Sequence, residues 1–209
     1  MRKNSKKAIV TAAIALFNTK GYAGTSIRDI AAKANANPST ISYYFDNKLG
    51  LLEYCFTDYF ERYIKQIEES LPLLDSGAAA CLKKALENIL YFQCSNIQMS
   101  RFIAREMSLD SQIVREIMST YFQKEKYYFQ EMLETGMKRG EFRKHSPDYA
   151  LIQLKGLLTM PFLNPHYITE VLHVFPHERY FAEKYLEQIE LWLEGTILST
   201  TVGIPSAVS

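Results

Sequence analysis

Proline, glycine and cysteine are all scarce in this 209-residue sequence, which has seven, nine and three of them. Cys55, Cys81 and Cys94 cannot all pair with one another and none lies in a CxxC pattern, which argues against a disulfide framework and against a zinc site. No run of about 18 apolar residues is present, so no membrane-spanning helix is expected. The apolar fraction of 47% and the charged fraction of 22% are typical of a globular protein. We therefore expect a cytoplasmic protein.

Motifs of catalysis are also missing. The sequence has no GxSxG, no phosphate-binding P-loop and no GxGxxG, and its acidic residues form no recognisable pair. His173 and His177 are four residues apart, but Pro176 between them disfavours a helix and no acidic residue follows at ligand spacing. His145 and His166 are isolated. The sequence thus predicts no enzymatic activity, no cofactor and no metal site.

The apolar residues of the sequence are spaced mainly as in α-helices. Apolar residues recur at a spacing of three and four along nearly the whole chain, and the alternation typical of β-strands is nearly absent. These patterns predict an all-α protein with irregular structure around Pro161 and Pro165. The expected helices cover residues 5–20, 26–35, 38–45, 48–71, 78–94, 98–109, 111–139, 148–159 and 177–198.

Charge divides the chain into two parts. The first 50 residues carry eight basic and two acidic side chains, for a net charge of +6, and the remaining residues sum to −5. A basic N-terminal part on an acidic body favours contact between that part and a polyanion such as DNA.

The segment "SIRDIAAKANANPSTISYYFDNK", residues 26–48, resembles two short helices joined by a polar turn. Ser26 and Asp29 have the spacing of a capping box. An asparagine such as Asn35 tolerates the left-handed conformation that a tight turn requires. Asn37 is expected to cap the next helix, with Pro38 in its first turn. This pattern indicates a helix-turn-helix.

The second of these helices has one face for the core and one for solvent. Ile41 and Phe45 are four residues apart and are expected to point inward, which turns Ser39 and Tyr43 outward. A short surface helix in an ordinary bundle would also fit this spacing. Arg28, Lys48 and the basic residues Arg2, Lys3, Lys6 and Lys7 favour DNA, because they can bind phosphates on either side of the exposed helix.

The order of residues in "GYAGTSIRDIAAKANANPSTISYYFDNKLGLL" resembles the TetR family of bacterial regulators. The resemblance covers about residues 9–52 and implies a homodimer on a near-palindromic DNA site, active as a repressor or other regulator of transcription at the nucleoid. Asn35, Asn37, Ser39 and Ser42 depart from residues that are common in the family, which leaves the DNA sequence open. The residues then expected to bind DNA are Arg28, Asn37, Ser39, Thr40, Ser42, Tyr43, Tyr44 and Lys48.

The resemblance also implies a division into a helix-turn-helix domain, residues 1–47, and a helical dimerisation and effector domain, residues 48–200. We expect residues 201–209 to be disordered. The last helix is apolar on more than one side and needs two burying surfaces. With the helix before it, we expect it to form a two-fold four-helix interface. The predicted interface residues are Leu151, Leu154, Leu158, Leu186, Ile189, Leu193 and Ile197.

Two readings of the body remain open, a small-molecule effector site and a protein-docking surface. Aromatic residues such as Tyr91, Phe102 and Phe122 could line a pocket, although such stripes more often form core. The segments "MSRFIAREMSLDS" and "IVREIMSTYFQKEKYYF" are similar to RefZ-type regulators of cell division in spore-forming bacteria, which act on the protein FtsZ. A partner such as FtsZ would then meet the charged residues Arg101, Arg105, Glu106, Arg115 and Glu116.

Overall fold

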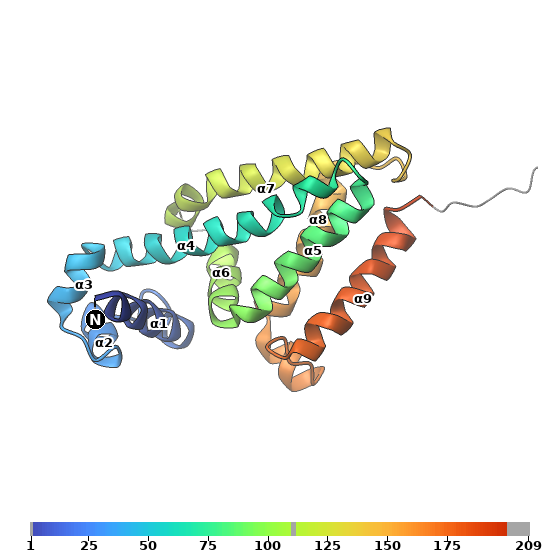
Figure 1. Ribbon diagram of the computed structural model, residues 1–209. Helices are drawn as coiled ribbons and strands as arrows, with labels where there is room; N and C mark the ends of the chain where they lie inside the picture. The colour runs from blue at the N-terminus through green and yellow to red at the C-terminus, as the bar shows by residue number, and fades with distance from the viewer. Residues whose placement is uncertain (1, 110–111, 200–209) are drawn as a thin grey trace, which may run out of the picture.

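The chain folds almost entirely into helices, as the periodicity predicts. The computed structural model describes residues 2–109 and 112–199 (Figure 1). Among these residues, no helix has the length and apolar character needed to cross a membrane. The elements are α1 (Arg2–Lys20), α2 (Ile27–Lys33), α3 (Pro38–Phe45), α4 (Lys48–Glu68), the 3-10 turn η1 (Leu71–Leu73), α5 (Ala78–Ser95), α6 (Ile97–Leu109), α7 (Gln112–Lys138), α8 (Pro147–Leu163), the π-helical turn η2 (Tyr167–Val171) and α9 (Arg179–Thr196).

The first three helices form a small head at one end of the molecule (Figure 1). Ile9 and Phe17 of α1, Ile30 of α2 and Ile41 of α3 are fully buried. These side chains recur at helical spacing, so each helix contributes one apolar stripe to a shared core. Burial of each such side chain contributes about 1.5–3 kcal/mol to folding.

The long helix α4 runs from the head into the body (Figure 1). Its buried side, which includes Leu51, Phe56 and Ile64, passes from the head core to the body core without a break. In the body α4 packs against α5 and α7, and α5 also contacts α9. One helix therefore contributes to both cores, which form a single cluster of buried residues.

A second connection joins head and body through α6. The Arg105 guanidinium donates to the backbone oxygens of Phe17 and Asn18 at the end of α1, at 2.5 and 3.1 Å. It also pairs with Glu106, which is buried, at 3.1 Å. Arg105 and Glu106 were expected on a partner-docking surface, and the structure corrects this for Glu106, which is buried, whereas Arg105 is half-buried and makes the contacts above. Arg101 is half-buried and its Nε has no hydrogen-bond partner among the described residues.

A charged network around Glu125 lies in the core of the body. Glu125 of α7 accepts two hydrogen bonds of 2.9 Å from the Lys155 ammonium of α8 and one of 2.5 Å from the Tyr63 hydroxyl of α4. Burial and the neighbouring Glu125 carboxylate raise the pKa of Tyr63. Phe102 and Phe129 are buried core residues, and the cavity beside the network holds only about 20 Å³. That volume is about the size of one water molecule.

The structure corrects five of the seven predicted dimer residues in the last two helices. Leu193 is 0% exposed, and Leu154, Leu158, Ile189 and Ile197 are also buried within the protomer. Leu151 and Leu186 are half-buried and pack against the same core. Five of the seven predicted residues therefore face the core of the protomer, whereas Leu151 and Leu186 keep part of their surface exposed.

Several element boundaries also differ from the sequence prediction, among them those of α8 and α9. Pro161 was expected in an irregular corner, but it lies inside α8 and is buried, and the helix continues to Leu163. The last helix begins at Arg179, two residues later than predicted. The tail predicted to be disordered, residues 201–209, lies outside the described residues, as does residue 111, where the seventh helix was expected to begin.

Candidate nucleic-acid interface

Capping side chains fix the start of α2. The Ser26 hydroxyl accepts from the backbone N–H of Asp29 at 3.1 Å, and the Asp29 carboxylate accepts from the Ser26 backbone N–H at 2.9 Å. This capping box was predicted and is confirmed. The hydrogen bonds from Ser26 lower the pKa of Asp29. The carboxylate is therefore charged at neutral pH, where it also favours the helix N-terminus.

The turn between α2 and α3 has the expected left-handed residue. Asn35 adopts φ of 49°, which is uncommon for residues other than glycine. Asn37 then caps α3, because its side-chain oxygen accepts from the Ser39 backbone N–H at 2.9 Å and from the Ser39 hydroxyl at 2.8 Å. Pro38 occupies the first turn. The turn and cap together set the direction in which α3 leaves α2.

The two faces of α3 are separated as predicted. Ile41 is 0% exposed and Phe45 is buried, whereas Tyr43 is 74% exposed. Ser39 and Ser42 are exposed, and Thr40 is half-buried. Because the inward residues anchor α3 in the head core, the hydroxyl-bearing side chains are held on a rigid surface facing solvent.

Two aromatic side chains at the end of α3 support each other. The rings of Tyr43 and Tyr44 lie edge to face with centroids 5.2 Å apart, and Tyr44 is half-buried and packs against the head core. An aromatic pair of this kind adds about 0.5–1.5 kcal/mol beyond area burial. Tyr44 thus limits the positions that the exposed Tyr43 ring can take.

Lys48, predicted as a phosphate ligand at the start of α4, makes contacts inside the head. Its ammonium donates to the backbone oxygens of Tyr22 and Thr25 at 3.0 and 2.9 Å and lies 4.3 Å from the centre of the Tyr22 ring. The cap of α4 is Asn47, whose side chain accepts from the backbone N–H groups of Leu49 and Gly50. Lys48 therefore holds the turn after α1 against the first turn of α4.

Close packing of α3 on α4 depends on Gly50. A Cβ atom at this position would overlap the carbonyl oxygen of Phe45, the last residue of α3. Sequence reasoning identified neither this requirement nor the carbonyl contacts of Lys48. Both residues lie in the segment "NKLG". Their contacts depend on how closely two helices approach each other, and residue spacing in the sequence does not reveal that distance.

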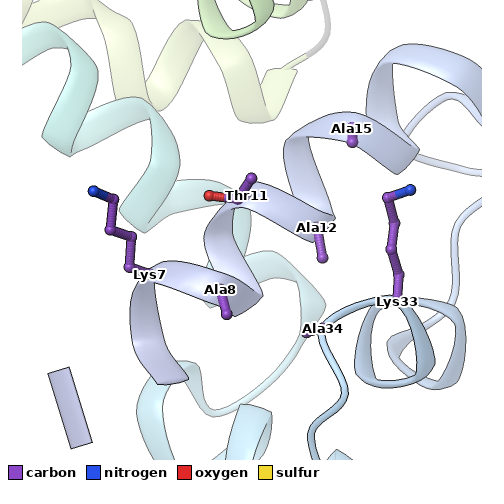
Figure 2. A pocket seen from close by; sticks show the side chains of 7 residues that line it. All are labelled: Lys7, Ala8, Thr11, Ala12, Ala15, Lys33 and Ala34. Carbon is purple, nitrogen blue, oxygen red and sulfur yellow. The ribbon is translucent and has the colours of Figure 1, made fainter. Parts of the chain in front are cut away.

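Basic side chains are exposed on the helices that pack against α3. Arg28 is exposed on α2, and Lys33 is exposed at the end of the same helix. A groove of about 470 Å³ lies between α1 and α2, with a floor of alanine side chains, and Figure 2 shows Lys7 and Lys33 extending from opposite sides of it. Arg2 and Lys3 lie on α1, but their side chains are outside the described set. No group of three metal-ligating side chains occurs in the part of the chain that the structure describes.

Comparison with known proteins identifies relatives of the head and of the whole chain. Residues 9–55 match the family model for bacterial regulatory proteins of the tetR family. The chain is 40% identical over 205 residues to the probable HTH-type transcriptional regulator YttP of Bacillus subtilis (strain 168), covering 98% of this chain and 99% of that protein. A shorter match of 39% identity over 62 residues, 28% of this chain and 33% of the relative, is to the IcaR negative transcriptional regulator of the biofilm operon icaADBC in Staphylococcus aureus.

Solved structures share the fold across nearly the whole chain. The TetR family regulator PfmR from Thermus thermophilus aligns with a TM-score of 0.74 at 16% identity, over 90% of this chain and 97% of that one. A tetR family protein from Rhodococcus RHA1 aligns with a TM-score of 0.72 at 20% identity, over 88% and 94%. A relative that spans nearly the whole chain is YttP and not a RefZ-type protein, so the predicted resemblance of the body to that group is not supported and FtsZ is not proposed as a partner.

Proposed function

Because the chain belongs to the TetR family of DNA-binding transcriptional regulators, we propose that it binds a near-palindromic DNA site as a homodimer and represses transcription there. The observation that carries this proposal is the exposed face of α3, where Ser39, Ser42 and Tyr43 point away from the buried Ile41. Repression is supported by the partial match to IcaR, which is named a negative regulator.

The side chains of α3 suit base edges in the major groove. Serine and threonine hydroxyls can donate to or accept from any base, and a tyrosine ring can pack against the methyl group of thymine. None of these side chains adds a charge that would bind every sequence equally. We assign sequence reading to Ser42 and Tyr43, with Thr40 and Asn37 beside them.

The surrounding cations suit the phosphate backbone. Arg28 is exposed beside α3. Lys48 uses two of its three N–H donors on carbonyl oxygens of the head, which leaves one for a phosphate. Tyr44 and the hydroxyl of Ser39 lie at the two ends of α3. In this assignment Arg28 and Lys48 supply affinity and register, but not sequence preference.

The homodimer is proposed through the outer faces of α8 and α9. Ile152 of α8 is 66% exposed and Leu191 of α9 is 59% exposed. Tyr149, Met160 and Leu163 continue the face of α8, and Tyr180 continues that of α9. Large apolar residues that share a helical face and remain exposed are typical of a protein interface. Two copies paired in this way would bring four helices together and set the two heads about 34 Å apart, one DNA turn.

Light scattering of purified protein tests the dimer. Ile152→Arg combined with Leu191→Arg is expected to yield a monomer, because two charges would be buried without partners. Tyr127→Arg on α7 is the matched control, since Tyr127 is also exposed, and it should stay dimeric. A dimer that survives the double substitution would contradict the α8 and α9 interface.

Genomic fragments retained by the protein test DNA recognition. The fragments should share an inverted repeat, and a footprint on one of them should cover two half-sites occupied by two chains. We expect affinity for this site to exceed affinity for a shuffled duplex by at least about 1,000-fold. Equal binding to every duplex would contradict a sequence-specific regulator.

A further inference from the structure

A cleft lies where the head meets the body, between α1 and α4. It has a volume of about 580 Å³, within the range of about 300–1,000 Å³ that is usual for small-molecule sites. The helix α1 packs on α2, α3 and α6, and the cleft separates it from the face of α4 below the head. Figure 1 shows α1 lying alongside the first half of α4.

The walls of the cleft are two helical rows at a spacing of four residues. Lys6, Val10 and Ile14 line it from α1. Tyr54, Asp58 and Arg62 line it from α4. Met99 at the start of α6 adds a further apolar side chain, and a shallower groove of about 280 Å³ extends the space past Ile97. The middle of the cleft is therefore apolar.

The side chains that line the cleft carry more positive than negative charge. The ammonium of Lys6 lies 3.9 Å from the centre of the Tyr54 ring, and Lys7 lies next to it on the rim. At the other end Arg62 donates to the Asn96 side chain at 3.0 Å and to Asp58 at 3.4 Å. Three cations thus face one carboxylate, and that carboxylate is paired with Arg62.

We propose that this cleft binds an amphipathic anion, a molecule with an apolar chain or ring system and a single carboxylate or phosphate. The apolar part would lie against Val10, Ile14 and Met99, and the anionic group would meet Lys6 and Lys7. The site differs from the cavity at the buried Glu125, which holds only about 20 Å³. A molecule in the cleft contacts both α1 and α4, so it sets the angle between the head and the helix that enters the body.

Calorimetric titration of the full chain with dodecanoate, below its micelle concentration and without DNA, tests the site. We expect one dodecanoate per chain and much weaker binding of dodecan-1-ol, which has the same length but no charge. Lys7→Gln should weaken dodecanoate binding by about threefold to tenfold. Lys33→Gln removes the same charge from the head outside the cleft and should leave binding unchanged.

A second pair of variants separates the cleft from other parts of the surface. Thr11 is exposed and lines the cleft, so Thr11→Trp should block dodecanoate without disturbing the core. Thr19→Trp on the same helix is the control and should bind normally. Equal binding of the alcohol, equal loss in both lysine variants or full binding to Thr11→Trp would each overturn the proposal.

The consequence for DNA rests on the proposed function and is measured separately. Dodecanoate is expected to change the affinity of the protein for its genomic fragment, and the change should be lost in Thr11→Trp. Failure of DNA binding in the absence of dodecanoate would contradict the proposed function but not the cleft. Calorimetric binding with no change in DNA affinity would contradict the coupling between α1 and α4 only.

Discussion

Lys48 contributes to the structure of the head as well as to its charge. Its ammonium satisfies the backbone oxygens of Tyr22 and Thr25. Lys48→Ala leaves both oxygens without this donor, so we expect the free energy of unfolding to fall by about 1–2 kcal/mol. Affinity should fall by a similar factor for every duplex, because Lys48 no longer holds the first turn of α4 against the turn after α1. Urea unfolding and fluorescence anisotropy measure the two effects.

Lys65→Ala is the control for this prediction, because Lys65 is an exposed lysine of α4 outside the head. It should change neither stability nor DNA affinity measurably. A Lys48→Ala protein with unchanged stability and a flatter salt dependence of binding would instead identify Lys48 as a phosphate ligand only.

Burial makes the cysteine thiols unreactive. Desolvation raises the pKa of Cys55 and of Cys94 to about 12, and it also raises the pKa of Cys81. The reactive thiolate is therefore almost absent at pH 8. We expect Ellman's reagent to modify no thiol of the folded protein within minutes and three thiols after denaturation. Rapid reaction of one thiol in the native protein would contradict the burial of that residue.

The same shifts determine a dependence of stability on pH. The folded-state pKa of these thiols lies above the ordinary value of 9.0. The unfolded chain consequently loses its thiol protons first as pH rises. The stability that burial of the neutral thiol provides is complete below pH 9 and declines above it.

At the scale of single elements, sequence alone predicts α3 well. The spacing of Ile41 and Phe45 fixes the inward face, and Asn35 and Asn37 occur where the turn and cap require them. These features depend on residues within one or two turns of each other, so local rules determine them. The exposed side of α3, and hence its candidate DNA contacts, follows from the same spacing.

The orientation of α8 and α9 could not be predicted in the same way. Apolar residues lie on two sides of α8, with Leu154 and Leu158 inward and Ile152 and Met160 outward. Periodicity shows that two faces are apolar, but it does not show which face meets the protomer core. Buried Pro161 likewise continues the helix because surrounding packing outweighs the local preference of proline.

The buried charged network links three elements of the body. Lys155→Met removes the cation that pairs with Glu125 and leaves the carboxylate buried, which costs about 3–5 kcal/mol. Tyr63 still donates one hydrogen bond but supplies no charge. Urea unfolding of this variant should therefore show a large loss of stability.

The double variant Glu125→Gln with Lys155→Met provides the control. It removes both charges, so its loss of stability should be smaller than that of Lys155→Met alone. Equal losses in the single and double variants would contradict the predicted cost of leaving the Glu125 carboxylate buried without its cation.

At the scale of the whole molecule, two connections hold the head to the body. The helix α4 runs through both cores, and Arg105 of α6 binds the last carbonyl groups of α1. The head carries a net charge of +6 in its first 50 residues and the rest of the chain −5. DNA is therefore expected to attract the basic end of the molecule, while the exposed apolar faces of α8 and α9 are available for the proposed pairing of two chains.

The central claim is that the outward face of α3 reads base sequence, and Tyr43→Ala tests it most directly. The quantity measured is the ratio of affinity for the genomic fragment to affinity for a shuffled duplex, at one salt concentration. Tyr127→Ala is the matched control, since Tyr127 is an exposed tyrosine of α7. We expect Tyr43→Ala to lower this ratio by about tenfold and Tyr127→Ala to leave it unchanged. An unchanged ratio in Tyr43→Ala would contradict the claim.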